Sequence, residues 1–337
     1  MSRISRYQES IQRFIINKSS VNDLEKSVKD NIFEIVNEFD HVVSIMLLTV
    51  IKNQGNKNNL TLNGYYMASG IEMMMLIATL QDREKRYNKR YSAEKRMNMI
   101  YELVGQINVS LSMNIDSLQS HFGAAGGKEK ILKVFHKCVK LVNGKLVKLL
   151  VVDAYELGGK IKTTDLVNYH FGDLEKVKQR LVLLSQVKEG SFMGGMNNKY
   201  GSVCQLAVVL GWILGGGDDK SISSLEKVGT YLANIIKLTN DFINLEQDIL
   251  DAELYSKNYI INYGFQNAFE FFVESKEKFI EACIVLDIYT NTVKEIVDLL
   301  ENKVDSVIDK SSPDMKSHYT LESNLLGKLK SPMDILL

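Results

Sequence analysis

Proline is almost absent from this chain, and that absence constrains the fold more than any other feature. Only Pro313 and Pro332 occur among the 337 residues. Proline is the residue that most reliably breaks an α-helix, because its ring removes a hydrogen bond and clashes with the preceding turn. More than three hundred consecutive residues therefore lack this helix breaker, which favours long, uninterrupted helices.

Apolar residues recur at the spacing of helices and not of strands. One stripe, with intervals of three and four residues, consists of Leu225, Val228, Leu232, Ile235, Thr239 and Phe242. Alternation with a period of two, bounded by Asn-Gly or Asp-Gly turns, is hard to find. We therefore expect an all-α fold, a helical bundle of roughly ten to twelve helices.

Polar and glycine-rich stretches predict where these helices end. They are residues 53–59, GSFMGGM at 190–196 and GGG at 215–217, since glycine and asparagine favour turns over helix interiors. The apolar stretch at 203–214 is shorter than the roughly 18–20 residues that span a bilayer, so it predicts a buried helix and no transmembrane segment. No linker divides the chain, and we expect one helical domain at 1–310 with a looser C-terminal tail at 311–337.

The charges and cysteines exclude several classes of protein. Lysine plus arginine and aspartate plus glutamate both number 41, so no overall field favours nucleic acid as a partner. Any anionic ligand must be held by a local cluster. Cys138, Cys204 and Cys283 are far apart in apolar helical patterns, which indicates neither a disulfide framework nor a zinc site and favours a cytoplasmic location.

Three motifs occupy residues 199–251 in one consistent register: KYGSVCQLA from Lys199, LGWILGGGDD from Leu210 and LTNDFIN from Leu238. Here the chain resembles the trans-isoprenyl diphosphate synthase (polyprenyl synthase) family. In order, the three segments stand where that family has its KTGxLF element, a small-residue helix end followed by acidic residues, and its second aspartate-rich motif. The resemblance implies a single-domain bundle of the isoprenoid synthase type, with helices around a central cavity.

A second match covers residues 67–90, which resemble the helix of the family's first aspartate-rich motif, DDxxD. Asp82, Arg83 and Arg86 stand where the family has three aspartates, so only the first aspartate is kept. The stretch at 55–57 stands in place of an upstream basic Gly-Lys-Arg element. Residues 90–198 are the least similar part of the chain.

In the family, Mg²⁺ bridges carboxylates of two facing helices and the diphosphate of an allylic substrate, while basic residues take the remaining charge. The resemblance implies Mg²⁺ as cofactor and prenyl diphosphate as ligand. By this resemblance the metal ligands are Asp82, Asn240, Asp241, Asn244 and Asp248; the diphosphate ligands are Lys57, Arg83, Arg86, Arg90 and Lys199; the catalytic residues are Asp241 and Lys199; and the prenyl-chain pocket is lined by Met74, Ile77 and Ala78.

The altered residues leave alternatives open. Asn240, Asp241 and Asn244 share one helical face, which Asp248 continues a turn later, but this set carries less charge than three carboxylates. The asparagines could instead satisfy contacts between helices. Arginines after Asp82 could bind a diphosphate directly without metal, or they could form a solvated face with an exposed ion pair. The methionine run before Asp82 could be ordinary core.

Three functions follow from these observations. The first is a divergent prenyltransferase whose magnesium is held mainly by the second motif. The second is a non-catalytic subunit that dimerises with an active synthase, because arginines replace metal ligands in the first motif. The third is a lyase similar to the terpene synthases, suggested by the NDxxNxxxD pattern at 240–248 and by His318-Tyr319. Enzyme activity therefore stays open, and we expect either a homodimer or a heterodimer with a related synthase.

Overall fold

The computed structural model describes residues 2–57, 64–82, 90–122, 127–156, 189–249, 258–263 and 265–310, and every regular element in these ranges is helical. The all-α prediction is therefore confirmed. The elements are α1 (Arg3–Lys18), η1 (Ser20–Asp23), α2 (Lys26–Val36), α3 (Val42–Lys57), α4 (Tyr65–Asp82), α6 (Ala93–Phe122), α7 (Gly127–Glu156), α9 (Glu189–Met196), η4 (Asn197–Gly201), α10 (Ser202–Leu214), α11 (Ile222–Ile249), α12 (Tyr259–Tyr263), α13 (Phe265–Val285) and α14 (Asn291–Lys310).

The chain divides into two compact units. The first comprises Met1–Asp153, Asn197–Thr230 and Ala282–Ile296, and the second comprises Ala154–Met196, Tyr231–Glu281 and Val297–Leu337. Each unit is described by itself below. The expected single domain at 1–310 and the central cavity stay predictions, and the tail at 311–337 lies outside the described residues.

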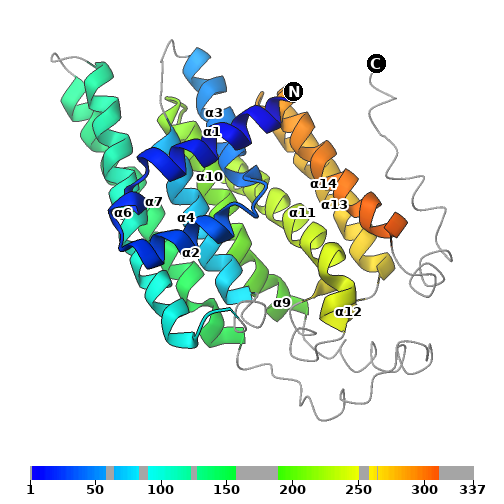
Figure 1. Ribbon diagram of the computed structural model, residues 1–337. Coiled ribbons are helices and arrows are strands. Elements are labelled where there is room, and N and C mark those ends of the chain that lie inside the picture. The colour runs from blue at the N-terminus through cyan, green and yellow to red at the C-terminus, as the bar shows by residue number, and fades with distance from the viewer. Residues whose placement is uncertain are drawn as a thin grey trace, which may run out of the picture. The chain divides into compact units, whose positions relative to one another are not determined.

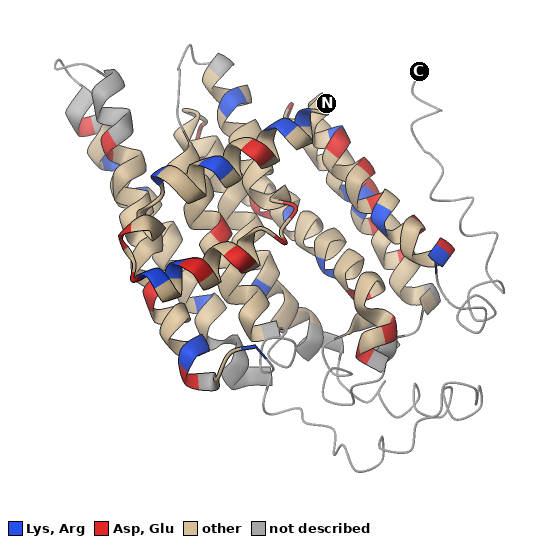
Figure 2. Cartoon of the chain, in the orientation of Figure 1, with Lys and Arg blue, Asp and Glu red and all other residues tan. Residues whose placement is uncertain are grey.

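The first unit is built around α10, the most apolar helix of the chain. Every residue of α10 except Gln205 is buried, as expected for a helix without a polar face. The helix packs against α3, while α4 packs along α6, and these helices run beside one another in Figure 1. In Figure 2, α10 carries no charged residue, whereas the surface helix α2 carries both signs. The prediction of a buried helix at 203–214 is confirmed.

The three glycines at 215–217 end α10 as predicted. Gly216 has a φ of 85°, a left-handed conformation that glycine adopts without steric cost. The amides of Gly215 and Gly217 return to the carbonyls of Gly211 and Trp212, at 3.1 and 2.9 Å. These bonds satisfy carbonyls that the helix end would otherwise leave unpaired.

Two other predicted connections are helical instead. Residues 190–196 lie in α9, and α3 continues through residues 53–57 of the predicted loop. Glycine and asparagine cost a helix at most about 1 kcal/mol each relative to alanine. Packing of the helix as a whole outweighs a penalty of that size.

The second unit holds the rest of α11 with α12 and most of α13 and α14. Asn234 of α11 donates from Nδ2 to the Ser275 hydroxyl of α13 at 3.3 Å. Lys276 of α13 forms a 2.9 Å ion pair with Glu301 of α14, and the two helices lie side by side in Figure 1. The predicted apolar stripe of α11 is buried at every position.

No helix among the described residues combines the length and the apolar character needed to cross a membrane.

Candidate functional site

The second aspartate-rich motif lies on α11, and its central carboxylate is already paired. Asp241 Oδ1 lies 2.5 Å from the ammonium of Lys237, one turn earlier on the same helix. Both side chains are buried. Burying two charges is costly unless they neutralise each other at close range, and this pair meets that condition.

Asn258, just before α12, connects the two carboxylates of the motif. Its Nδ2 donates to the carbonyl oxygen of Asp241 at 3.0 Å and to Oδ2 of Asp248 at 2.9 Å. The amide of Tyr259 donates to Oδ2 of Asp241 at 3.0 Å, and Asn258 Oδ1 accepts from the amide of Ile260 at 2.9 Å. We call Lys237, Asp241, Asp248, Asn258 and Tyr259 the α11–α12 polar cluster.

The two asparagines of the motif lie at the edge of this cluster. Asn240 and Asn244 are partly exposed, and Asn244 donates from Nδ2 to the carbonyl oxygen of Asn240 at 2.5 Å. That bond uses the backbone of Asn240 and not its carboxamide. The carboxamide oxygens are the ligands these residues would offer to a hard cation.

These contacts define what a metal would meet at the motif. Among the described residues, no three His, Cys, Asp or Glu side chains gather closely enough to hold an ion. In the arrangement described, the Asp241 carboxylate is balanced by Lys237 and Asp248 accepts from Asn258. A metal would have to displace an ammonium from Asp241, so the donor set as placed does not fit Mg²⁺. Magnesium at this motif stays a prediction.

Lys199 belongs to the first unit, on a different element. It lies in η4, a π-helical turn between α9 and α10, and is only 1% exposed. Single π-helical turns inside helical segments are frequent at functional sites. Tyr200, the next residue, is also buried. The turn therefore holds a lysine ammonium in the interior of the first unit.

The remaining sequence-predicted residues are placed as follows. Met74, Ile77 and Ala78 are fully buried on α4, and their role as a pocket wall stays a prediction. Arg90 forms ion pairs with Glu34 and with Glu38, the latter at 3.4 Å. Arg83, Arg86 and the side chains of Lys57 and Asp82 lie outside the described residues.

A second buried ionisable pair was not predicted from the sequence. Nδ1 of His41 lies 3.1 Å from Oε2 of Glu72, and both side chains are buried in the first unit. Burial alone would lower the pKa of His41, but the charge and hydrogen bond of Glu72, with the charge of Asp40, raise it overall. His41 precedes α3 and has a φ of 58°, which is unusual for a residue with a side chain.

The cysteines offer no reactive thiolate. All three are buried with free thiols. Burial raises the pKa of Cys138 to about 12 and raises the pKa of Cys204 and Cys283 as well. The thiolate is the nucleophilic form of cysteine, so at neutral pH these residues serve as apolar core.

Comparison with known proteins places the fold in a class. Sequence comparison finds no matching family model and no matching curated protein. Comparison of structures finds an isoprenyl-synthase-like all-α fold. One similar solved structure is described as the crystal structure of geranylgeranyl pyrophosphate synthase, with a TM-score of 0.50 and 10% sequence identity. The match covers 98% of this chain and 99% of that chain, and at this identity it shows the fold alone.

Proposed function

We propose that this chain is an isoprenoid-synthase-like protein that binds a prenyl diphosphate. The observation that carries the proposal is the shared fold, which extends over nearly the full length of both chains. The similar protein is named for geranylgeranyl pyrophosphate, so a prenyl diphosphate is the ligand class that the fold favours. Fold alone does not determine function, and the residues must supply further support.

Lys199 provides that support. A diphosphate carries several negative charges, and charge-assisted hydrogen bonds from an ammonium are among the strongest that a protein can offer. An ammonium with 1% exposure acts in a medium that screens charge far less than water does. The buried lysine of η4 also stands at the position of the lysine in the family's KTGxLF element, which the resemblance assigns to the diphosphate.

A second candidate function is a non-catalytic subunit of an active synthase, and the Lys237–Asp241 contact favours it. Ionising a prenyl diphosphate requires strong neutralisation of the leaving group. In the family, metal held by the second motif contributes to this. Here the Lys237 ammonium lies 2.5 Å from the Asp241 carboxylate. Breaking a buried ion pair of this kind costs on the order of 3–5 kcal/mol. Binding without rapid turnover is consistent with that cost.

Replacing Lys199 tests the proposed ligand site. Lys199→Gln removes the charge but keeps most of the chain length, so the affinity for geranylgeranyl diphosphate should fall roughly tenfold or more. Lys227→Gln, on the exposed face of α11, is the matched control and should leave the affinity unchanged. If both variants bind geranylgeranyl diphosphate as tightly as the wild-type protein does, Lys199 does not contribute to the ligand site.

A turnover assay separates the two candidate functions. The chain is incubated with an allylic diphosphate, isopentenyl diphosphate and magnesium, and the products are resolved by chain length. Turnover that disappears in Asp241→Ala would support the prenyltransferase. Ligand binding without turnover, together with association with an active synthase, would support the non-catalytic subunit.

A further inference from the structure

A pocket of about 480 Å³ in the first unit is lined by none of the candidate site residues described above. It lies between α1, α3, the start of α4 and the start of α14, and we call it the α1–α3–α14 pocket. Its lining residues are Arg3, Arg6, Tyr7, Ser10, Thr49, Lys52, Asn53, Tyr65, Thr290 and Thr292. Its volume lies within the roughly 300–1,000 Å³ typical of sites for small ligands.

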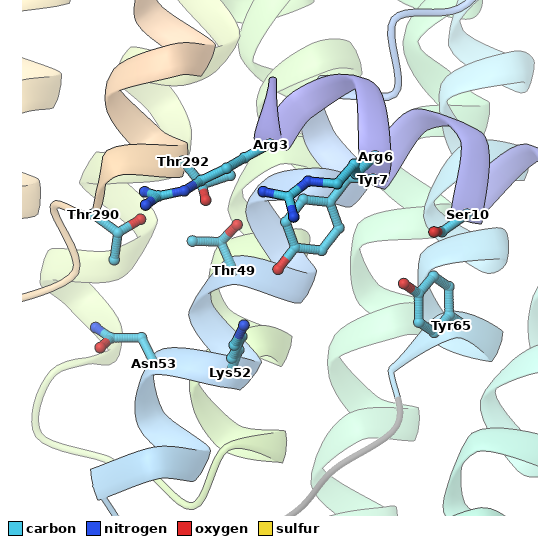
Figure 3. Close-up of a pocket in the computed structure, with 10 residues that line it drawn as sticks. All are labelled: Arg3, Arg6, Tyr7, Ser10, Thr49, Lys52, Asn53, Tyr65, Thr290 and Thr292. Atoms are coloured by element: carbon cyan, nitrogen blue, oxygen red, sulfur yellow. The ribbon is translucent and has the colours of Figure 1, made fainter. Parts of the chain in front are cut away.

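The charge of this pocket has one sign. Arg3, Arg6 and Lys52 contribute three positive charges, and none of the lining residues is acidic. None of the three forms an ion pair with another residue that the structure describes. In Figure 3 the ends of these side chains point into a common space. Like charges that line one pocket repel one another, and a bound anion would relieve that repulsion.

Hydroxyl groups complete the lining. Thr49 is 5% exposed. Burial raises the pKa of Tyr7, and a side-chain hydrogen bond with Thr49 opposes that rise, so the two hydroxyls lie close together. Figure 3 shows the Thr49 hydroxyl between Arg6 and Lys52, facing the same space. Both hydroxyls line the pocket, and each can donate a hydrogen bond to an oxygen of a bound ligand.

The start of α14 adds a further site of positive potential. Thr290 precedes the helix, and its Oγ1 accepts a hydrogen bond from the amide of Val293 at 3.3 Å. Thr292, in the first turn of the same 20-residue helix, also lines the pocket. Amides in the first turn of a helix have no intrahelical acceptor and carry a partial positive charge, which favours an anion.

Contacts around the pocket hold its walls in place. Asn53 of α3 donates to the carbonyl oxygen of Asp287 at 2.7 Å, which ties α3 to the segment before α14. The carboxylate of Glu295 accepts the amide of Ile4 at 3.1 Å, which ties α14 to the start of α1. The ring centroids of Phe14 on α1 and Tyr65 at the start of α4 are 5.5 Å apart, so these two helices are also in contact. The pocket is therefore preorganised, which reduces the cost of ordering it on binding.

We infer that the α1–α3–α14 pocket binds a small organic phosphate or diphosphate. The three cations, the Thr49 hydroxyl and the first turn of α14 would hold the phosphate oxygens. The pocket has room for more than a phosphate group, and its two aromatic rings, Tyr7 and Tyr65, offer apolar surface to the organic part. The site has no carboxylate in its lining, so binding requires no metal.

Calorimetric titration of the full chain with sodium pyrophosphate, at low ionic strength and with a chelator present, tests this inference. We expect binding that weakens as salt is added, because the cations are exposed. Arg6→Gln and Lys52→Gln should each weaken binding roughly tenfold, and Thr49→Val should weaken it several-fold. Circular dichroism and the melting temperature of each variant show that the fold is kept.

Two controls identify the site. Arg13 is an exposed residue of α1 that does not line the pocket, so Arg13→Gln should leave pyrophosphate affinity unchanged. In a Lys199→Gln background, which removes the proposed prenyl diphosphate site, Arg6→Gln and Lys52→Gln should still weaken pyrophosphate binding roughly tenfold, which keeps the two sites distinct. Failure to bind pyrophosphate, equal weakening by Arg13→Gln, or no further weakening by Arg6→Gln and Lys52→Gln in the Lys199→Gln background would each overturn the inference.

Discussion

Buried charge in this protein is held in local pairs, and the pair of His41 and Glu72 makes stability depend on pH. Because Glu72 raises the pKa of His41 above its ordinary value of 6.5, the folded state binds a proton more tightly than the unfolded state. The stabilisation is complete below the unfolded pKa and is lost as the pH rises through the folded pKa.

The measurement for this pair is urea unfolding across pH 6 to 8. The difference in free energy of unfolding between the wild-type protein and Glu72→Gln should narrow as the pH rises through this range. A difference that stays constant or widens would mean that His41 does not bind its proton more tightly in the folded state.

Lys237 and Asp241 allow a second test at the scale of residues. Lys237→Met leaves the Asp241 carboxylate buried without its counter-charge, which should cost on the order of 3–5 kcal/mol of unfolding free energy. The double variant Lys237→Met, Asp241→Asn removes both charges and keeps an oxygen for the amide of Tyr259, so much of the loss should be recovered. Urea unfolding of the single and double variants measures the coupling. If the double variant is as unstable as Lys237→Met, the loss of unfolding free energy does not come from the unpaired charge of Asp241.

Close packing of helices sets the next scale. A Cβ at Gly211 of α10 would lie 2.8 Å from the carbonyl oxygen of Leu47 and 2.9 Å from Cβ of Val50, both on α3. Gly211→Ala should therefore force the two helices apart and lower the unfolding free energy by about 1–3 kcal/mol.

Gly105 of α6 is the matched control for Gly211. A Cβ there would meet nothing within 4 Å, so Gly105→Ala should raise stability by about 0.5–1 kcal/mol through helix propensity alone. Melting temperatures of the two variants should shift in opposite directions. A stabilised Gly211→Ala protein would contradict the close approach of α3 and α10.

The sequence predicted the helical class, the buried helix α10 and the apolar stripe of α11, because these follow from local periodicity. It did not predict that α3 continues through residue 57 or that 190–196 are helical, since tertiary packing overrides weak propensities there. The spacing of the second motif identified Asp241 and Asp248. It did not identify their partner Asn258. Contacts between distant segments do not appear in the spacing of one helix.

The whole molecule has an isoprenyl-synthase-like fold, and the Asp241 carboxylate of its second acidic motif is paired with Lys237. The proposed ligand is a prenyl diphosphate, whereas the polar groups of the α11–α12 polar cluster bind one another through hydrogen bonds and an ion pair. A prenyl diphosphate ligand and an Asp241 paired with Lys237 are compatible if the protein binds the ligand mainly through basic residues. Magnesium would then add little to the affinity.

The most direct test of this account is calorimetric titration of the wild-type protein with geranylgeranyl diphosphate, with magnesium and with a chelator in its place. We predict binding in both conditions, with affinities that differ by less than about tenfold, which corresponds to about 1.4 kcal/mol. Binding only with magnesium would contradict an Asp241 carboxylate held by Lys237 and support a working metal site at Asp241 and Asp248. Absence of binding in both conditions would contradict the proposed function itself.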